Sequence, residues 1–212
     1  MKKKIKSIAI FCNGQKISKH IFSLYKSTID YIICADGGAN KIINLNVTPN
    51  AIIGDFDSIT KKLLNKYTNC EIVHIPDQNS TDLEKALQHA ITFQPKNIYI
   101  FGAIGSRIDH TLTNLNMLKK FHKYFNIEII SNKAKLIYIN RSVKLKLPNC
   151  SVVSLFPIGL VKKITLKGFK FPLKNEDLEF GVRDGQSNLT IDNEQEIIFE
   201  QGELLVTINF QL

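Results

Sequence analysis

Residues 31–58 read YIICADGGANKIINLNVTPNAIIGDFDS. Two short apolar runs, 31–35 and 51–53, have the β-branched composition of buried strands. The segment between them, 38–45, is typical of a helix, so this stretch predicts a strand–helix–strand unit. Strands that alternate with helices form mainly parallel sheets with helices on both faces. The stretch therefore favours an α/β fold.

The same alternation continues on both sides of this unit. Further strands are predicted at 5–11, 71–75, 97–101 and 127–130. Further helices are predicted at 18–26, 60–67, 81–93 and 109–121. We therefore expect an α/β domain over residues 1–132, with a mainly parallel sheet covered by helices.

After residue 132 the pattern changes to short alternating runs that are separated by turn residues. The runs are 135–139, 143–147, 152–156, 162–166, 196–200 and 204–210. Residues such as Pro157, Gly168 and Gly202 supply the breaks between them. The pattern predicts a small all-β, sandwich-like domain over residues 133–212.

The composition is that of an ordinary soluble globular protein, with 44% hydrophobic and 22% charged residues among 212. No apolar stretch approaches the roughly 20 residues that span a bilayer. The run 8–12, which follows a lysine-rich start, is too short for a signal peptide. Because the four cysteines stand singly, a disulfide framework or a zinc site is not expected. We expect a cytoplasmic protein with no membrane partner.

The net charge of +9 raises the alternative of a nucleic-acid partner. The excess lysines are spaced rather than clustered, however, and no arginine-rich arm or RRM-type motif is present. A lysine-rich solvent face explains the charge better, and we expect no nucleic-acid partner. A non-catalytic nucleic-acid or nucleotide-binding module would differ by showing strongly salt-dependent affinity for polyanions and no turnover.

Aspartates mark the ends of the predicted strands. Six of the first seven stand where a predicted strand gives way to a loop or helix: Asp36, Asp55, Asp57, Asp77, Asp82 and Asp109. The carboxyl ends of parallel strands form the edge at which such sheets bind ligands. Hard oxygen ligands in this number suit Mg²⁺ that carries the phosphates of a nucleotide. The pattern therefore predicts phosphoryl chemistry.

Asp55 and Asp57 form a DxD pair at the end of a predicted strand. In an extended chain the two carboxylates share one side, and two like charges so close favour a bound cation. An Asx-type turn, with Asp57 capping the helix that starts near Thr60, is the structural alternative. The segment DFDSI also resembles the DxDx[TV] nucleophile motif of haloacid-dehalogenase-type phosphatases. Ile59 replaces the usual Thr or Val, and no later DD follows a strand, so we rank a phosphatase second.

The CADGGAN segment, 34–40, carries paired glycines between a predicted strand and helix. Gly37 and Gly38 would let a phosphate or ribose approach the backbone, and a helix N-terminus favours an anion. The structural alternative is a plain tight turn in which Asp36 caps the helix.

In DQNSTDLE, 77–84, Thr81 and Glu84 form a capping box. The box explains those two residues. It does not require Asp77, Gln78 or Asp82, which are expected at the same sheet edge as the DxD pair.

In GAIGSRIDH, 102–110, a glycine-bearing loop joins a predicted strand to a predicted helix. The loop could wrap phosphates, and Arg107 offers a planar fork to their oxygens. Asp109 is also the natural N-cap of the helix. His110 and Asn114 share one helix face, either as ligand contacts or as structural residues.

Together these motifs resemble the thiamine pyrophosphokinase (thiamine diphosphokinase) family. DGG, GDFDS, DQxxTD and GxxGxRxDH, followed by Gln186-Ser187-Asn188, occur in that family's order and spacing over essentially the whole chain. Ser106 stands where bacterial members often have a second Gly, and Gln78 follows the DQ form of the motif rather than the DK form. The chain has no Trp, so any aromatic stacking on thiamine must come from Phe or Tyr.

The resemblance implies Mg²⁺-dependent transfer of a pyrophosphoryl group from ATP to the hydroxyl of thiamine, which gives thiamine diphosphate and AMP. It also implies a homodimer in which thiamine lies between the α/β domain of one chain and the β domain of the other. The expected metal ligands are Asp55, Asp57, Asp77 and Asp82, which with Arg107 are the expected catalytic residues. The expected nucleotide-binding residues are Asp36, Gly37, Gly38, Asn40, Gln78, Thr81, Gly102, Ser106, Arg107, Asp109 and His110. The expected thiamine-binding residues are Gln186, Ser187 and Asn188.

Overall fold

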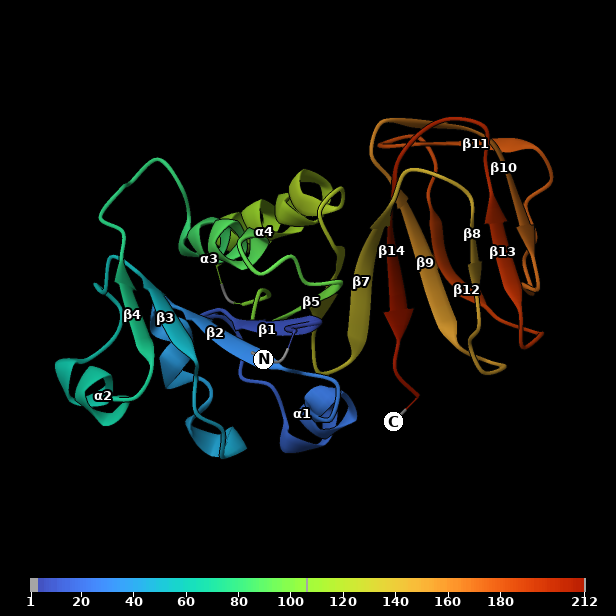
Figure 1. Ribbon diagram of the computed structural model, residues 1–212. Helices are drawn as coiled ribbons and strands as arrows, with labels where there is room; N and C mark the ends of the chain where they lie inside the picture. Colours follow the sequence, from blue (N-terminus) through green and yellow to red (C-terminus); the bar gives the residue numbers. More distant parts are fainter. Residues whose placement is uncertain (1–3, 106, 212) are drawn as a thin grey trace. The chain divides into compact units, whose positions relative to one another are not determined.

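A parallel sheet with the strand order β6–β5–β1–β2–β3–β4 forms the centre of the first part of the chain (Figure 1). The computed structural model describes residues 4–105 and 107–211, and the chain divides into two compact units, one up to Asn132 and one from Lys133. The strands of the first sheet are β1 (Ser7–Phe11), β2 (Tyr31–Ala35), β3 (Ala51–Gly54), β4 (Glu71–His74), β5 (Asn97–Phe101) and β6 (Asn126–Ile130).

Helices cover both faces of this sheet, α3 and α4 on one face and α1 and α2 on the other (Figure 1). They are α1 (Lys19–Lys26), α2 (Lys61–Lys66), α3 (Asp82–Ile91) and α4 (Ile108–Phe121). Because both faces are covered, all five residues of the central strand β1 are buried. This explains why the central strands have continuous apolar sequences instead of alternating ones.

The helix predicted at 38–45 is wrong. The chain forms two short 3₁₀ turns there, η1 (Asp36–Asn40) and η2 (Ile43–Leu45). Paired glycines are poor helix formers, and Gly38 packs so closely that a Cβ would lie 1.9 Å from the carbonyl oxygen of Phe11. The second turn ends at Asn46, whose φ of 52° is left-handed.

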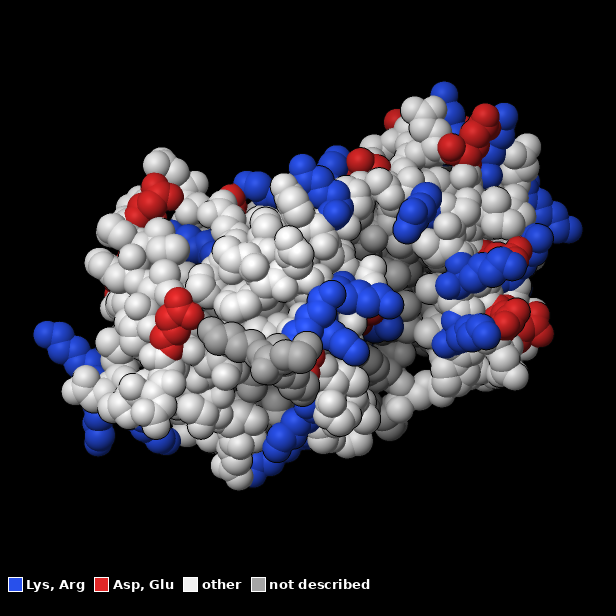
Figure 2. All heavy atoms as spheres, viewed as in Figure 1, with Lys and Arg blue, Asp and Glu red and all other residues white. Residues whose placement is uncertain are grey.

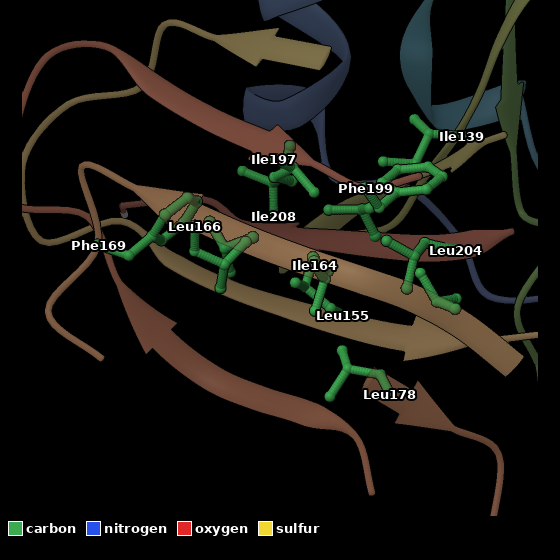
Figure 3. Close-up of a cluster of buried hydrophobic side chains, with 13 residues drawn as sticks. Ile139, Leu155, Ile164, Leu166, Phe169, Leu178, Ile197, Phe199, Leu204 and Ile208 are labelled. Atoms are coloured by element: carbon green, nitrogen blue, oxygen red, sulfur yellow. The ribbon is translucent and has the colours of Figure 1, made fainter. Parts of the chain in front are cut away.

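Two antiparallel sheets form the second unit. One has the order β12–β9–β14–β7 and the other β11–β10–β13–β8. Their strands are β7 (Ala134–Ile139), β8 (Val143–Leu145), β9 (Val152–Pro157), β10 (Leu160–Lys167), β11 (Glu176–Glu179), β12 (Gly185–Leu189), β13 (Gln195–Ile198) and β14 (Leu204–Asn209). Apolar side chains from both sheets meet between them (Figure 3), such as Leu155 and Ile208 on one side and Ile164 and Ile197 on the other.

Strands β11 and β12 were not expected from the sequence. Their segments, EDLE and GQSNL, lack the β-branched alternation that marks a strand. They form because each pairs with a strand that contributes side chains to the core, β11 with β10 and β12 with β9. Tertiary pairing therefore decides their structure.

Among the described residues, no helix is both long and apolar enough to cross a membrane.

We predict that Gly38→Ala destabilises the protein by about 1–3 kcal/mol, because the new methyl group would push against the backbone of β1. Urea unfolding measures the change. Gly159→Asn is the matched control: nothing lies within 4 Å of a Cβ there, and Asn tolerates its φ of +76°. Equal urea midpoints for Gly38→Ala and the wild type would contradict the close approach.

Candidate active site

Three aspartates from two neighbouring loops come together at the carboxyl edge of the first sheet. Asp36 follows β2, and Asp55 and Asp57 follow β3. Each offers a carboxylate oxygen, and these oxygens all lie within 4.8 Å of one another. We refer to these three residues as the carboxylate group. Oxygen ligands at this separation could hold a hard divalent cation.

Asp36 is the buried member of the group, with 1% of its surface exposed. One of its oxygens, Oδ2, accepts a hydrogen bond of 3.0 Å from the backbone N–H of Ser58. The other, Oδ1, is buried and has no hydrogen-bond partner among the described residues. A buried carboxylate oxygen without a partner is costly, and a cation would offset that cost. The group therefore fits a metal ion by its own chemistry.

The two carboxylates of the DxD pair are brought together by a turn. Strand β3 ends at Gly54, and Phe56 between the two aspartates has a left-handed φ of 65°. The backbone N–H of Asp57 points to Oδ1 of Asp55 at 3.4 Å, as in an Asx turn. The extended geometry expected from the sequence is therefore wrong. Thr60, rather than Asp57, caps α2, with its hydroxyl accepting from the N–H of Leu63 at 3.3 Å.

Asp82 lies beside this group, at the first position of α3. A Cβ placed on Gly54 would be 2.7 Å from the Cβ of Asp36 and 3.2 Å from Oδ1 of Asp82. Gly54 thus makes room for both carboxylates. Burial raises the pKa of Asp82, and the charges of Asp55 and Asp57 raise it further, against the effect of nearby Lys85.

Asp77 has a different environment. It is exposed and accepts hydrogen bonds from the backbone N–H of Asn79 at 3.1 Å, from the Asn79 amide at 2.8 Å and from Ser80 at 2.9 Å. These bonds lower the pKa of Asp77 and hold its own loop. The neighbouring Gln78 turns toward the carboxylate group instead and donates to Oδ2 of Asp55 at 3.0 Å. The structure therefore brings Gln78, and not Asp77, into contact with the carboxylate group.

Two other predicted residues hold the loops of this edge together. Thr81 caps α3, because its hydroxyl accepts from the backbone N–H of Glu84 at 3.2 Å. Asn40 donates to the carbonyl oxygen of Ser58 at 3.1 Å and so ties η1 to the loop after β3. A Cβ on Gly37 would lie 2.3 Å from the side-chain nitrogen of Asn13. The three loops are therefore closely packed.

The loop after β1, Asn13-Gly14-Gln15, was missed by the sequence reasoning. The N–H of Gly14 donates to Gly102 O at 2.8 Å, and that of Gln15 donates to Ile104 O at 2.7 Å. Gly102 itself has a left-handed φ of 68°. The signal was available, since an Asn-Gly pair directly after the most buried strand predicts a tight turn at the ligand edge. Ser106 lies outside the described residues.

Arg107 and Asp109 form a two-pronged ion pair at the start of α4. Nε of Arg107 lies 3.2 Å from Oδ1 of Asp109, and Nη2 lies 2.5 Å from Oδ2. The Arg107 guanidinium lowers the pKa of Asp109 to about 2. Arg107 occupies the N-cap position without a side-chain bond, so the expectation that Asp109 is the N-cap is wrong. Both side chains, like His110, are exposed and face solvent.

Gln186, Ser187 and Asn188 lie on the edge strand β12 of the second unit. Asn188 is buried, and its side chain is used within the fold: Oδ1 accepts from the N–H of Phe171 at 3.0 Å, and Nδ2 donates to Phe171 O at 2.6 Å. Ser187 is exposed with a left-handed φ of 59°, at an irregularity in the pairing with β9. Phe171 is 59% exposed.

Lysines of the second unit are paired with acidic residues. Glu196 lies 2.7 Å from Lys144 and 3.0 Å from Lys167, and Lys163 lies 2.6 Å from Glu200. Figure 2 shows basic side chains next to acidic ones on this face of the unit. These three lysines are exposed, at 57–78% of their side chains, as expected for a lysine-rich solvent face.

We predict that Asp36→Asn raises the Tm of the metal-free protein at pH 7. Burial, with a further contribution from the charge of Asp82, raises the pKa of Asp36 above its ordinary value, and the Ser58 N–H only partly offsets this. A carboxyl whose folded pKa is raised destabilises the fold increasingly as the pH rises from its unfolded pKa to its folded pKa. Asn keeps the acceptor for Ser58 and removes the charge.

Thermal unfolding in EDTA at several pH values tests this. The difference in Tm between Asp36→Asn and the wild type should shrink as the pH falls through the raised folded pKa of Asp36, because the wild-type carboxyl then becomes neutral in the folded state as well. A variant that is less stable than the wild type at pH 7 would mean that the ionised carboxylate stabilises the metal-free fold.

Comparison with known proteins identifies the family. The family model for the catalytic domain of thiamin pyrophosphokinase matches residues 22–131, and the model for its vitamin B1 binding domain matches residues 137–204. Thiamine pyrophosphokinase of Bacillus subtilis is 30% identical, over 95% of this chain and 98% of that protein. Thiamin pyrophosphokinase 1 of Caenorhabditis elegans is 29% identical, over 97% of this chain and 90% of that protein. A crystal structure of the Bacillus subtilis enzyme superimposes with a TM-score of 0.86 at 28% identity, covering 98% of this chain and all of that one. The carboxylate-lined sheet edge and the antiparallel second unit therefore belong to a member of the thiamine pyrophosphokinase family.

Proposed function

We propose that Asp36, Asp55 and Asp57, assisted by Asp82, hold the Mg²⁺ with which this chain transfers a pyrophosphoryl group from ATP to the hydroxyl of thiamine. The products are thiamine diphosphate and AMP. The observation that carries the proposal is the buried Oδ1 of Asp36, which has no partner among the described residues and lies in a group of carboxylates at the ligand edge of the sheet. Asp36, expected to bind nucleotide, thereby becomes a proposed metal ligand. Asp77, expected to bind metal, is proposed to shape the loop that presents Gln78.

The residues at this edge act mainly by positioning and by balancing charge. A bound Mg²⁺ would neutralise negative charge on the phosphates, as in other phosphoryl transfers. The oxygen of the thiamine hydroxyl forms a bond to the β-phosphorus as the bond between that phosphorus and the AMP oxygen breaks. The hydroxyl proton goes to a carboxylate of this edge. Asp82 is suited to accept it, because burial raises its pKa and so makes it the stronger base.

The nucleotide is proposed to lie over the loops that follow β1, β2 and β5. Glycines let these loops pack tightly against one another, because a Cβ on Gly14, Gly37, Gly38 or Gly102 would lie 2.6 Å or less from a neighbouring atom. The loops after β1 and β5 are also hydrogen-bonded to each other. Arg107 is exposed and would turn its guanidinium from Asp109 to the phosphates, where a planar fork can contact two oxygens. Until the nucleotide binds, the ion pair with Asp109 holds the Arg107 side chain in place. His110 follows Asp109 on α4.

Thiamine is proposed to contact the second unit through Ser187, Gln186 and the ring of Phe171. Asn188, which was expected to bind thiamine directly, would act indirectly, because its amide holds the backbone of Phe171 through two hydrogen bonds. A residue fixed in this way presents its exposed ring in one orientation, which suits stacking on an aromatic cation. A homodimer remains the prediction from the family resemblance, and light scattering of the purified protein would test it. We also keep the cytoplasm as the expected location, in line with four free cysteines.

We predict that Asp55→Asn and Asp82→Asn each lower thiamine diphosphate synthesis on the order of 10²-fold or more, as loss of a key electrostatic contact does. Each change removes one negative charge and nearly preserves shape. The assay incubates the protein with ATP, Mg²⁺ and thiamine and measures AMP, which should form only when thiamine is present. Near-normal rates at saturating Mg²⁺ would refute the metal assignment. Release of inorganic phosphate without thiamine would instead support the phosphatase.

We predict that Phe171→Leu raises the KM for thiamine roughly 3- to 10-fold, because aromatic stacking contributes about 0.5–1.5 kcal/mol beyond area burial. The KM for ATP should stay within about twofold. Phe180→Leu is the matched control, since Phe180 is also exposed, at 78%, but has no hydrogen bond to Asn188. If both variants change the thiamine KM equally, or neither does, Phe171 is not the stacking residue.

A further inference from the structure

A lysine is buried beside the carboxylate edge, by which we mean the carboxyl end of the first sheet with Asp36, Asp55, Asp57 and Asp82. Lys85 lies one turn after Asp82 on α3, and only 3% of its side chain is exposed. Its Nζ is 3.6 Å from Oδ1 of Asp82. Lysine is almost never buried to this degree unless it is paired, because removing an ammonium from water is costly. The proposed mechanism above does not use this residue.

The charge of Lys85 acts on more than one carboxylate. It lowers the pKa of Asp82, and it also lowers those of Asp55 and Asp77. The oxygens of Asp36, Asp55 and Asp57 lie within 4.8 Å of one another, and Asp82 lies beside them, so four carboxylates stand near one ammonium. One ammonium therefore offsets part of the negative charge at this edge and leaves the rest for another cation.

Ordinary ion pairing at the protein surface does not account for this arrangement. An exposed lysine–carboxylate pair contributes little to stability and costs little, as with Lys120 and Glu84, whose Nζ and Oε1 are 2.6 Å apart while the Lys120 side chain is 54% exposed. Lys85 instead places its charge in the interior, where an apolar side chain of similar length would cost less. A function at the neighbouring site would explain why a charge stands there.

We infer that Lys85 is a built-in counter-cation that makes the carboxylate edge discriminate against bare divalent ions and in favour of a metal–nucleotide complex. This inference rests on the proposed metal site. A free divalent cation at the carboxylate group is repelled by the nearby ammonium. A metal ion that arrives with a polyphosphate belongs to a complex of net negative charge, which the same ammonium attracts. Both effects are strengthened by burial, because the effective dielectric constant is low there.

The test compares two ligands on the same variants. Lys85→Met removes the charge and keeps the length of the side chain, and Lys85→Gln removes the charge while keeping a hydrogen-bond donor. Mn²⁺ alone is titrated into the nucleotide-free protein and followed by electron paramagnetic resonance. The Mg²⁺ complex of α,β-methylene ATP, which cannot be cleaved at the reacting bond, is titrated by calorimetry.

We expect the two affinities to move in opposite directions. Without the ammonium, Mn²⁺ alone should bind about 10-fold more tightly and the metal–nucleotide complex about 10-fold more weakly, as charges a few ångströms apart in a partly buried site would give. A merely structural lysine cannot produce this result, since a distorted site would weaken both. Weakening of both, tightening of both, or no change in either would overturn the inference.

Three controls sharpen the experiment. Lys85→Arg keeps the charge and should stay closer to the wild type than Lys85→Gln for both ligands. Lys120→Met removes an exposed ammonium from its pair with Glu84 of α3 and should change neither affinity by more than about twofold, because solvent screens it.

Asp55→Asn tests the proposed metal site separately from the inference on Lys85. If Mn²⁺ binds equally well to Asp55→Asn and the wild type, the proposed metal site fails and this inference with it. If Asp55→Asn loses Mn²⁺ but the Lys85 variants do not move in opposite directions, only the inference on Lys85 fails.

Discussion

The constraint on which the first unit depends is the placement of like-charged carboxylates at the edge of a parallel sheet. Repulsion opposes this arrangement, and burial of Asp36 adds to the cost. The backbone nevertheless holds these carboxylates close together. Asp36 is held in a left-handed conformation with φ of 40°, and the N–H of Ser58 holds one of its oxygens. Gly54 leaves the space that Asp36 and Asp82 occupy. The site stores unfavourable electrostatic energy that a bound cation would release.

The sequence predicts the elements of this unit well because its central strands are buried on both faces. Continuous apolar runs with clear ends give β2 and β5 with the bounds that the structure has, Tyr31–Ala35 and Asn97–Phe101. The aspartates could be placed at one edge from these ends alone, since parallel strands end together. What could not be predicted is which of them converge. Asp36 and Asp77 both follow strands, yet only Asp36 joins Asp55 and Asp57, because local turns orient each side chain.

The second unit shows a different limit of sequence reasoning. Its core follows from alternating runs, and the two sheets enclose Leu155, Ile164 and Ile197 as the pattern requires (Figure 3). Strand β12 is paired at the sheet edge in spite of its polar sequence, so its structure depends on β9 rather than on its own residues. Asn188 belongs to a motif that the family resemblance assigns to the vitamin. In the fold, it is a buried cross-link to Phe171. In the proposed thiamine site, Asn188 would therefore act through Phe171, whose backbone it holds, and not by direct contact.

The whole chain carries a net positive charge, whereas its candidate site is lined mainly by negatively charged side chains. The formal net charge is +9, which by itself would suggest a polyanion as the ligand. In the second unit, however, lysines such as Lys144 and Lys163 lie within 3 Å of glutamate oxygens, and they face solvent, where salt screens them. At the carboxylate edge the balance is reversed, since several aspartates face one buried lysine. The field that a cationic vitamin or a metal ion meets depends on the nearest, least-solvated charges. The small set of residues around Asp36 therefore decides what binds there, and the net charge of the chain does not.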